Sequence, residues 1–88
     1  MRIDKLMNKL CLVKSRSIAK KAADKNLIKV NDKLAKASQK IERGDKIEYE
    51  IYGYKTTIKI EKIPSGNVSK KKAPQYYEIL ERTKIKKN

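Results

Sequence analysis

Residues 14–30 read KSRSIAKKAADKNLIKV, and this stretch decides the fold because the spacing of its apolar residues changes partway through. Its first part carries apolar side chains at the spacing of one helix face: Ile18, Ala19, Ala22 and Ala23. We therefore expect a helix from about Arg16 to Lys25. Residues 27–30 alternate with a period of two instead, which predicts a short strand. Asn26 lies between the two, where a left-handed helix cap is expected and where Asn is tolerated.

A second amphipathic helix is expected upstream, over residues 3–13. Its apolar side consists of Ile3, Leu6, Met7, Leu10 and Val13. Asp4 suits the positive N-terminal turn of this helix. Cys11 flanks the apolar side and is expected in the core, since a free cysteine usually behaves as a small buried hydrophobe. Ser15 and Ser17 are expected to cap the following helix first and to act as ligand donors second.

The pattern downstream predicts a small antiparallel sheet. Asn31 and Asp32 suit the corner of a tight hairpin, whose return strand is expected from Leu34 to Ser38. Further strands are expected over residues 46–52 and 56–63, with a glycine turn at Gly44. The tyrosines, Ile79 and Leu80 of residues 75–85 suggest a short C-terminal helix. The expected fold class is α+β, with two N-terminal helices packed on a small antiparallel β-sheet.

One hydrophobic core should join the helices to the sheet. Its expected members are Ile3, Leu6, Leu10, Ile18, Ala22, Ile28, Val30, Ile47 and Tyr49. The other four tyrosines are ambiguous: they could stack bases or pack between the last strands and the C-terminal helix. Glu48 and Glu50 share one face of a strand and are expected as solvent-side partners of lysine.

The charge balance indicates a polyanionic partner. The chain has 88 residues, with 24 Lys and Arg against 10 Asp and Glu, and a net charge of +14. Residues 1–44 carry 13 basic and four acidic side chains, so the larger excess lies in the N-terminal half. Nucleic acid is the leading partner on this count, and an anionic membrane surface comes second.

Several function classes are disfavoured by what the sequence lacks. It has no His and a single cysteine, so no internal disulfide, no cysteine-based zinc site and no His-dependent catalysis is expected. We expect no enzyme activity, no metal and no cofactor. No apolar run approaches the roughly 20 residues of a membrane span, and no export signal precedes the first helix. A cytoplasmic protein is expected.

The candidate RNA-binding residues lie in the helix–helix–hairpin half of the chain. They are Arg2, Lys5, Lys14, Ser15, Arg16, Lys20, Lys29, Asn31, Lys36 and Ser38. Arg16 opens a helix, where its charge and the helix amides can act on one phosphate. Asn31 serves either as a turn former or as a base reader. As exposed cations contribute little to folding, replacing Arg2 or Arg16 with Ala should barely change stability.

Five short motifs resemble, in order and spacing, the S4 domain, the αL-type RNA-binding motif. They are residues 2–6 (RIDKL), 14–19 (KSRSIA), 28–31 (IKVN), 36–38 (KAS) and 44–45 (GD). Asn26 and Asp32 stand where the family usually has glycine, and both tolerate left-handed backbone. The resemblance covers about residues 1–52. It implies an S4-type domain over residues 1–63, followed by a basic loop, short helix and tail over 64–88.

A second resemblance lies in residues 71–80, KKAPQYYEIL. It is similar to the small stand-alone branch of the family that contains RqcP and the small ribosome-associated heat-shock proteins. This branch implies a role in ribosome quality control, on large ribosomal subunits obstructed by peptidyl-tRNA. The implied partners are large-subunit rRNA, peptidyl-tRNA and a NEMF-type quality-control factor, with no membrane. The implied activity is assistance in alanine-tail elongation or subunit rescue. The protein is expected to be a monomer.

Two other functions stay open on the sequence. One is a general rRNA- or tRNA-binding factor in ribosome assembly. The other is a membrane-surface protein that uses its first helix as a basic amphipathic anchor, although such helices favour Trp or Phe and the chain contains neither. A hydrolase is disfavoured because no pair of nucleophile and base is present.

Overall fold

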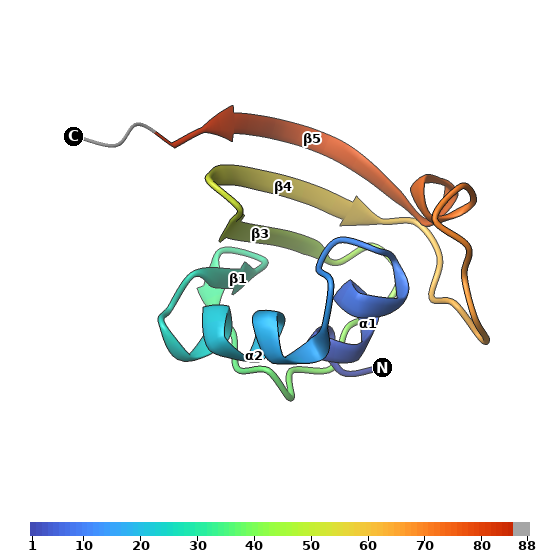
Figure 1. Cartoon of the computed structure of the whole chain (residues 1–88), viewed down its shortest axis with the longest axis horizontal. Coiled ribbons are helices and arrows are strands. Elements are labelled where there is room, and N and C mark those ends of the chain that lie inside the picture. The colour runs from blue at the N-terminus through green and yellow to red at the C-terminus, as the bar shows by residue number, and fades with distance from the viewer. Residues whose placement is uncertain (86–88) are drawn as a thin grey trace.

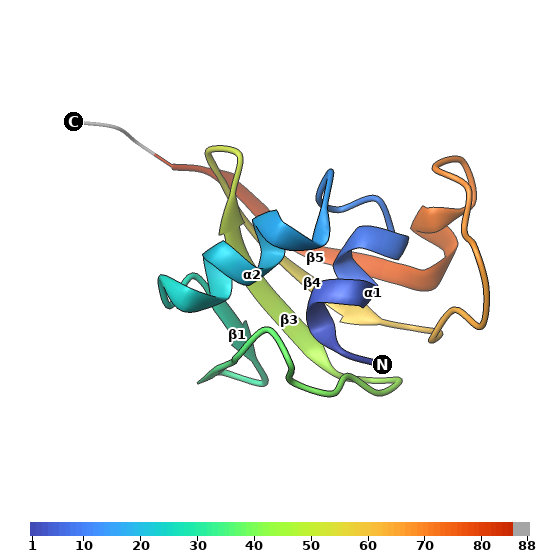
Figure 2. The ribbon, with the colours of Figure 1, turned by 60° about the horizontal axis from the view of Figure 1, so that its bottom comes forward.

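The structure, a computed structural model, describes residues 1–85. Its elements are α1 (Ile3–Lys9), α2 (Arg16–Asp24), β1 (Ile28–Val30), β2 (Lys33–Leu34), β3 (Lys46–Ile51), β4 (Tyr54–Ile60), the 3₁₀ turn η1 (Ala73–Tyr76) and β5 (Tyr77–Lys84). The strands form one antiparallel sheet in the order β2-β1-β3-β4-β5. Both helices lie on one side of this sheet, and β5 runs along the edge far from α2 (Figures 1 and 2). The predicted α+β class is confirmed.

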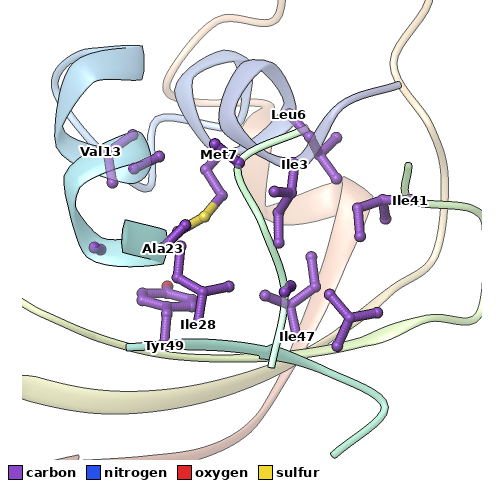
Figure 3. Packing of buried hydrophobic residues seen from close by; sticks show 14 of the residues in the cluster. Ile3, Leu6, Met7, Val13, Ala23, Ile28, Ile41, Ile47 and Tyr49 are labelled. Carbon is purple, nitrogen blue, oxygen red and sulfur yellow. The ribbon is translucent and has the colours of Figure 1, made fainter. Parts of the chain in front are cut away.

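The core lies between the two helices and one face of the sheet. Strand register sets this face, because Ile28 lies opposite Tyr49 and Ile47 lies opposite Ile58. Met7 extends from α1 toward Ala23 of α2, and the sheet residues point up at both (Figure 3). Eight of the nine predicted core residues are buried, whereas Ile18 is only partly buried against the cluster.

Each helix ends in a left-handed residue that reverses the chain. At the end of α2, Asn26 has φ 62° and its N–H donates to Ala23 O, while Leu27 N–H donates to Ala22 O. This pair of bonds is the Schellman motif, and it confirms the cap predicted at Asn26. The hairpin corner is also confirmed, since Asn31 and Asp32 both have positive φ, 50° and 69°.

The prediction that Cys11 lies in the core is wrong. α1 ends at Lys9, and Cys11 is the left-handed residue of a second Schellman motif, with φ 59°. Its N–H donates to Asn8 O, and the next N–H, of Leu12, donates to Met7 O. Because the chain turns at this residue, the Cys11 side chain leaves the apolar face of the helix and is exposed.

The predicted C-terminal helix over residues 75–85 is also wrong. Residues 73–76 form a single 3₁₀ turn, and residues 77–84 form β5 along β4. A β-bulge at Leu80 shifts the register, so Ile79 lies opposite Ile58 and Glu81 opposite Thr57. Without β5, β4 would have an unpaired row of backbone groups, and pairing outweighs a modest helical preference.

The return strand of the first hairpin is shorter than the predicted Leu34–Ser38. β2 ends at Leu34, and the following segment turns across the start of α1. There the N–H groups of Ile3 and Asp4 donate to the carbonyls of Gln39 and Ala37. These carbonyls satisfy two first-turn amides of α1, so the segment cannot also continue a ladder.

Candidate RNA interface

The candidate interface is built around the first turns of the two helices. The segment that follows β2 is held to α1 by the bonds from Ile3 and Asp4 just described. This attachment brings Lys36 and Ser38 beside Arg2, although more than thirty residues separate them in sequence. The proximity of these N-terminal and hairpin residues therefore has a backbone cause.

A buried carboxylate joins the two arginines that the sequence singled out. Asp4 Oδ2 lies 3.2 Å from Arg2 Nη2, and Asp4 Oδ1 lies 3.3 Å from Arg16 Nη2. The Asp4 side chain is 5% exposed, whereas those of Arg2 and Arg16 are 51% and 47% exposed. Each guanidinium carries five N–H donors, so engagement of one nitrogen by Asp4 leaves donors that can face a phosphate.

The expectation that Ala at Arg2 or Arg16 leaves stability unchanged therefore rests on a premise that the structure contradicts. It treated both side chains as isolated surface cations. In the structure each one compensates a carboxylate that is nearly removed from water. Removing either arginine leaves that buried charge with fewer partners, which costs stability.

Four of the ten predicted residues line one open groove next to this ion-pair cluster. They are Arg2, Lys20, Lys36 and Ser38, and the groove also touches Asp24 and Asn26. Lys20 lies one helical turn after Arg16 on α2, so the groove and the arginine pair form a continuous basic surface. We call this surface, made of Arg2, Arg16, Lys20, Lys36 and Ser38, the basic groove.

Ser15 occupies the predicted N-cap position of α2, with extended backbone, but its side chain makes no capping hydrogen bond. The capping role predicted for it is wrong, and its hydroxyl is left as a donor beside Arg16. Lys14 takes part in a different contact, since its backbone N–H donates to the Tyr52 hydroxyl at 3.0 Å. Its side chain lies at a second groove that includes Tyr52.

Three further predicted residues lie apart from the basic groove. Lys29 alternates with buried Ile28 and Val30, so its side chain faces the side of the sheet that carries no helix. The Asn31 amide group is engaged on both atoms, donating to Asp45 Oδ1 and accepting from Lys46 N–H, which matches a turn former. Lys5 is exposed on α1 and does not line the groove.

Sequence reasoning missed the role of Asp4. The sequence pattern indicates only that Asp4 is a favourable charge in the first turn of α1. A possible signal was present, because Arg2 and Asp4 are two residues apart and Arg16 opens the next helix, but their meeting depends on how α1 packs on α2.

The comparisons with known proteins agree with this geometry. A family model described as "S4 domain" matches residues 1–47, which include both arginines and the segment that attaches to α1. The chain belongs to the S4 domain family. Heat Shock Protein 15 of Vibrio cholerae, described as trimeric, has a similar fold with a TM-score of 0.83. The two are 29% identical, over 90% of this S4 protein and 80% of the Vibrio chain.

Curated relatives match this chain over its length. One is the RQC P-site tRNA stabilizing factor of Streptococcus pneumoniae, 33% identical over 100% of this chain and 99% of the relative. A protein of the same name from Bacillus subtilis is 31% identical over 97% of this chain and 98% of its own. The similarity thus extends beyond residues 1–47 to β4 and β5.

Residues 1–85 hold neither a cluster of metal-ligating side chains nor a helix that could cross a membrane. This part of the chain contains no group of three or more His, Cys, Asp or Glu side chains that could hold a metal ion. None of its helices combines the length and the apolar character needed to cross a membrane.

Proposed function

We propose that this S4-domain protein is an RNA-binding factor of ribosome quality control. It binds tRNA and rRNA on large ribosomal subunits obstructed by peptidyl-tRNA. It acts by binding, without catalysis, and assists alanine-tail elongation or subunit rescue. Relatives with the name RQC P-site tRNA stabilizing factor, matched over nearly the whole chain, support the role. The S4 domain over residues 1–47 supports RNA as the ligand.

The single observation that carries the proposal is the pair of arginines held by Asp4 at the edge of the basic groove. A guanidinium matches a phosphate with two parallel N–H donors, and a fixed guanidinium loses less freedom on binding. Two such groups separated by one carboxylate can grip successive phosphates of a backbone. Lys20 and Lys36 add point charges along the groove. Recognition then depends on RNA shape more than on base sequence.

Co-sedimentation with purified large subunits tests this function. Subunits that carry peptidyl-tRNA and vacant subunits are incubated with the protein at equal concentrations, and the bound fraction is measured. We expect tighter binding to the obstructed subunits, because tRNA phosphates and rRNA phosphates are then both available. Equal binding to both would instead match a general ribosome assembly factor. No binding to either would contradict the function.

The proposal also includes the cellular location, the oligomeric state and one partner protein. The protein acts in the cytoplasm as a monomer, and a NEMF-type factor joins it on the obstructed subunit. A hydrophobic core cluster that is buried within one copy supports the monomer. Sedimentation equilibrium of the free protein measures its mass, and a trimer would contradict this part. Recruitment of the NEMF-type factor is measured by adding it to obstructed subunits with and without this protein.

A further inference from the structure

A third groove, lined by aromatic side chains, lies on the helix side of the sheet where neither helix covers it. The sheet has five strands, and the two helices pack over only part of it, so β4 and β5 extend beyond them (Figure 2). The groove has a volume of about 200 Å³. Its lining includes Tyr54, Tyr77 and Arg82 of β4 and β5. Leu12, in the loop that follows α1, and Tyr52 also line it.

Arg82 and Tyr54 form an ordered pair in this groove. The guanidinium carbon of Arg82 lies 4.4 Å from the centre of the Tyr54 ring. Arg82 lies opposite Thr56 in the β4–β5 ladder, and Thr56 is buried, so its register directs Arg82 to the helix side. A planar cation packed on one ring can offer its other face to a further aromatic group.

Tyr52 is also held in place, although 55% of it is exposed. Its hydroxyl accepts a hydrogen bond from the backbone N–H of Lys14, in the loop that leads into α2. Tyr52 and Leu12 belong as well to an adjoining groove that is lined by Lys14 and Lys70. The aromatic groove is therefore continuous with a cationic groove, which reaches Lys14 shortly before the start of α2.

We propose that the aromatic groove binds one unpaired nucleotide of the RNA, with its base against the Arg82–Tyr54 pair and its phosphate toward Lys14 and Lys70. The inference rests on the proposed function, since it requires that RNA is the ligand. A nucleotide combines a flat aromatic base with a negative phosphate, which matches the tyrosines and the cations in turn. The charge of +14 favours a polyanion over a neutral peptide in the same space.

The cationic groove connects the aromatic groove to Lys14, which lies two residues before Arg16 of the basic groove. The aromatic groove can therefore take part in RNA recognition. Paired RNA on the basic groove would present only its backbone to Arg2 and Arg16. A base that is extruded from a bulge or an open end could reach the aromatic groove from there. The protein would then favour RNA with an unpaired base near a helix, while the identity of that base would matter little, because every base has a stacking face.

Three RNA hairpins test the proposal with the full-length chain. They share one 12-base-pair stem: the first is fully paired, the second carries a single bulged adenosine, and the third carries an abasic residue at the bulge. The abasic residue keeps the phosphate and the bend but removes the base. We expect the adenosine bulge to bind about 5- to 150-fold more tightly than the abasic bulge, the range for one stacked base.

Variants assign this preference to the groove. Arg82→Lys keeps the charge and Tyr54→Leu keeps apolar volume, so both should reduce the adenosine preference to less than about threefold with an unchanged affinity for the paired stem. Arg43→Lys is the matched control, because Arg43 is an exposed arginine away from this groove. It should behave like the wild type.

The outcomes separate the two proposals. If the wild type binds all three hairpins equally, or if Arg82→Lys and Tyr54→Leu keep the full preference for adenosine, the nucleotide site is wrong while RNA binding stands. If the wild type binds none of the hairpins, RNA binding itself fails.

Discussion

The carboxylate of Asp4 lies 3.3 Å from the guanidinium of Arg16, and this contact ties the first turn of α1 to the first turn of α2. Asp4 also pairs with Arg2 at 3.2 Å, so one buried acid orients two half-exposed cations. Because hydrogen bonds to charged groups are stronger than neutral ones, the arrangement links the stability of the helix pair to the geometry of the basic groove.

Replacing Asp4 with Asn should weaken both folding and RNA binding. The amide cannot pair ionically with two guanidinium groups, so we expect a loss of about 1–2 kcal/mol in the free energy of unfolding. RNA affinity should fall about three- to tenfold, roughly 1 kcal/mol, because Arg2 and Arg16 lose their fixed positions. Urea denaturation and RNA titration measure the two effects.

Asp24→Asn is the matched control for this variant, since Asp24 is an exposed acid of α2 that forms no ion pair within residues 1–85. Both substitutions remove one negative charge and so raise the net charge by one unit. If charge alone governs binding, both variants bind RNA more tightly, and a positioning role of Asp4 is then refuted.

Replacing Arg16 with Ala should weaken binding to obstructed large subunits by about 1–3 kcal/mol, the range for a hydrogen bond to a charged group. Arg16→Lys should recover only part of the loss, because lysine keeps the charge without the planar fork. Stability should fall by about 0.5–1 kcal/mol, since Asp4 retains Arg2. Arg2→Ala should behave similarly.

Lys59→Ala serves as the control for Arg16→Ala. Lys59 alternates with buried Ile58 and Ile60 on β4, so it lies on the side of the sheet away from the helices. Lys86, a basic residue of the C-terminal tail, lies outside the described residues. If Lys59→Ala weakens binding while Arg16→Ala binds like the wild type, the interface is on the other face.

The affinity for RNA should depend steeply on salt. With about four to six phosphate contacts, the logarithm of the binding constant should fall with the logarithm of salt concentration at a slope near −3 to −5. Arg16→Ala should make the slope less negative by about 1, because one phosphate contact is lost. A slope near zero for the wild type would remove the electrostatic basis of the interface.

Local patterns were enough to predict the helix pair and the first hairpin. The core face of α1 follows from apolar spacing, and the positive φ values of Asn26 and Asn31 follow from residue type. The exposure of the Cys11 side chain was not predictable in the same way. Its exposure depends on α1 ending at Lys9, and helix ends are the least regular part of such a pattern.

The features that sequence reasoning missed depend on contacts between distant segments. β5 is a strand because β4 offers an open edge, and its own residues fit either a helix or a bulged strand. Arg2 and Arg16 were both predicted as RNA-binding residues, but their common partner Asp4 was not. A pairing of three side chains depends on the packing of α1 on α2, which no single segment encodes.

Leu10 should contribute strongly to stability, as its burial predicts. The side chain is fully buried in the core, so Leu10→Ala should cost about 2–4 kcal/mol through lost burial and the cavity left behind. Leu34→Ala makes the same chemical change at a residue that is 58% exposed and should cost less than about 0.5 kcal/mol. Equal losses in the two variants on urea denaturation would contradict the position of Leu10.

Tyr49 should make the protein lose stability at alkaline pH. Burial, together with the nearby Tyr77, raises the pKa of Tyr49 from 10.0 to about 12. The folded chain thus holds this proton more tightly than the unfolded chain. The contribution is fully present below pH 10 and is lost as the pH rises toward 12, by about 2–3 kcal/mol in total.

The Tyr49→Phe variant isolates this effect, because it removes the buried phenol hydroxyl and keeps every lysine and the other four tyrosines. Unfolding free energies of both chains are measured by urea denaturation between pH 8 and pH 11.5. The wild type should lose stability relative to the variant only above about pH 10, where an unfolded tyrosine begins to ionise. If the difference between the two chains stays constant across this range, the phenol is not held in its neutral form by burial, and Tyr49 titrates as a solvent-exposed residue.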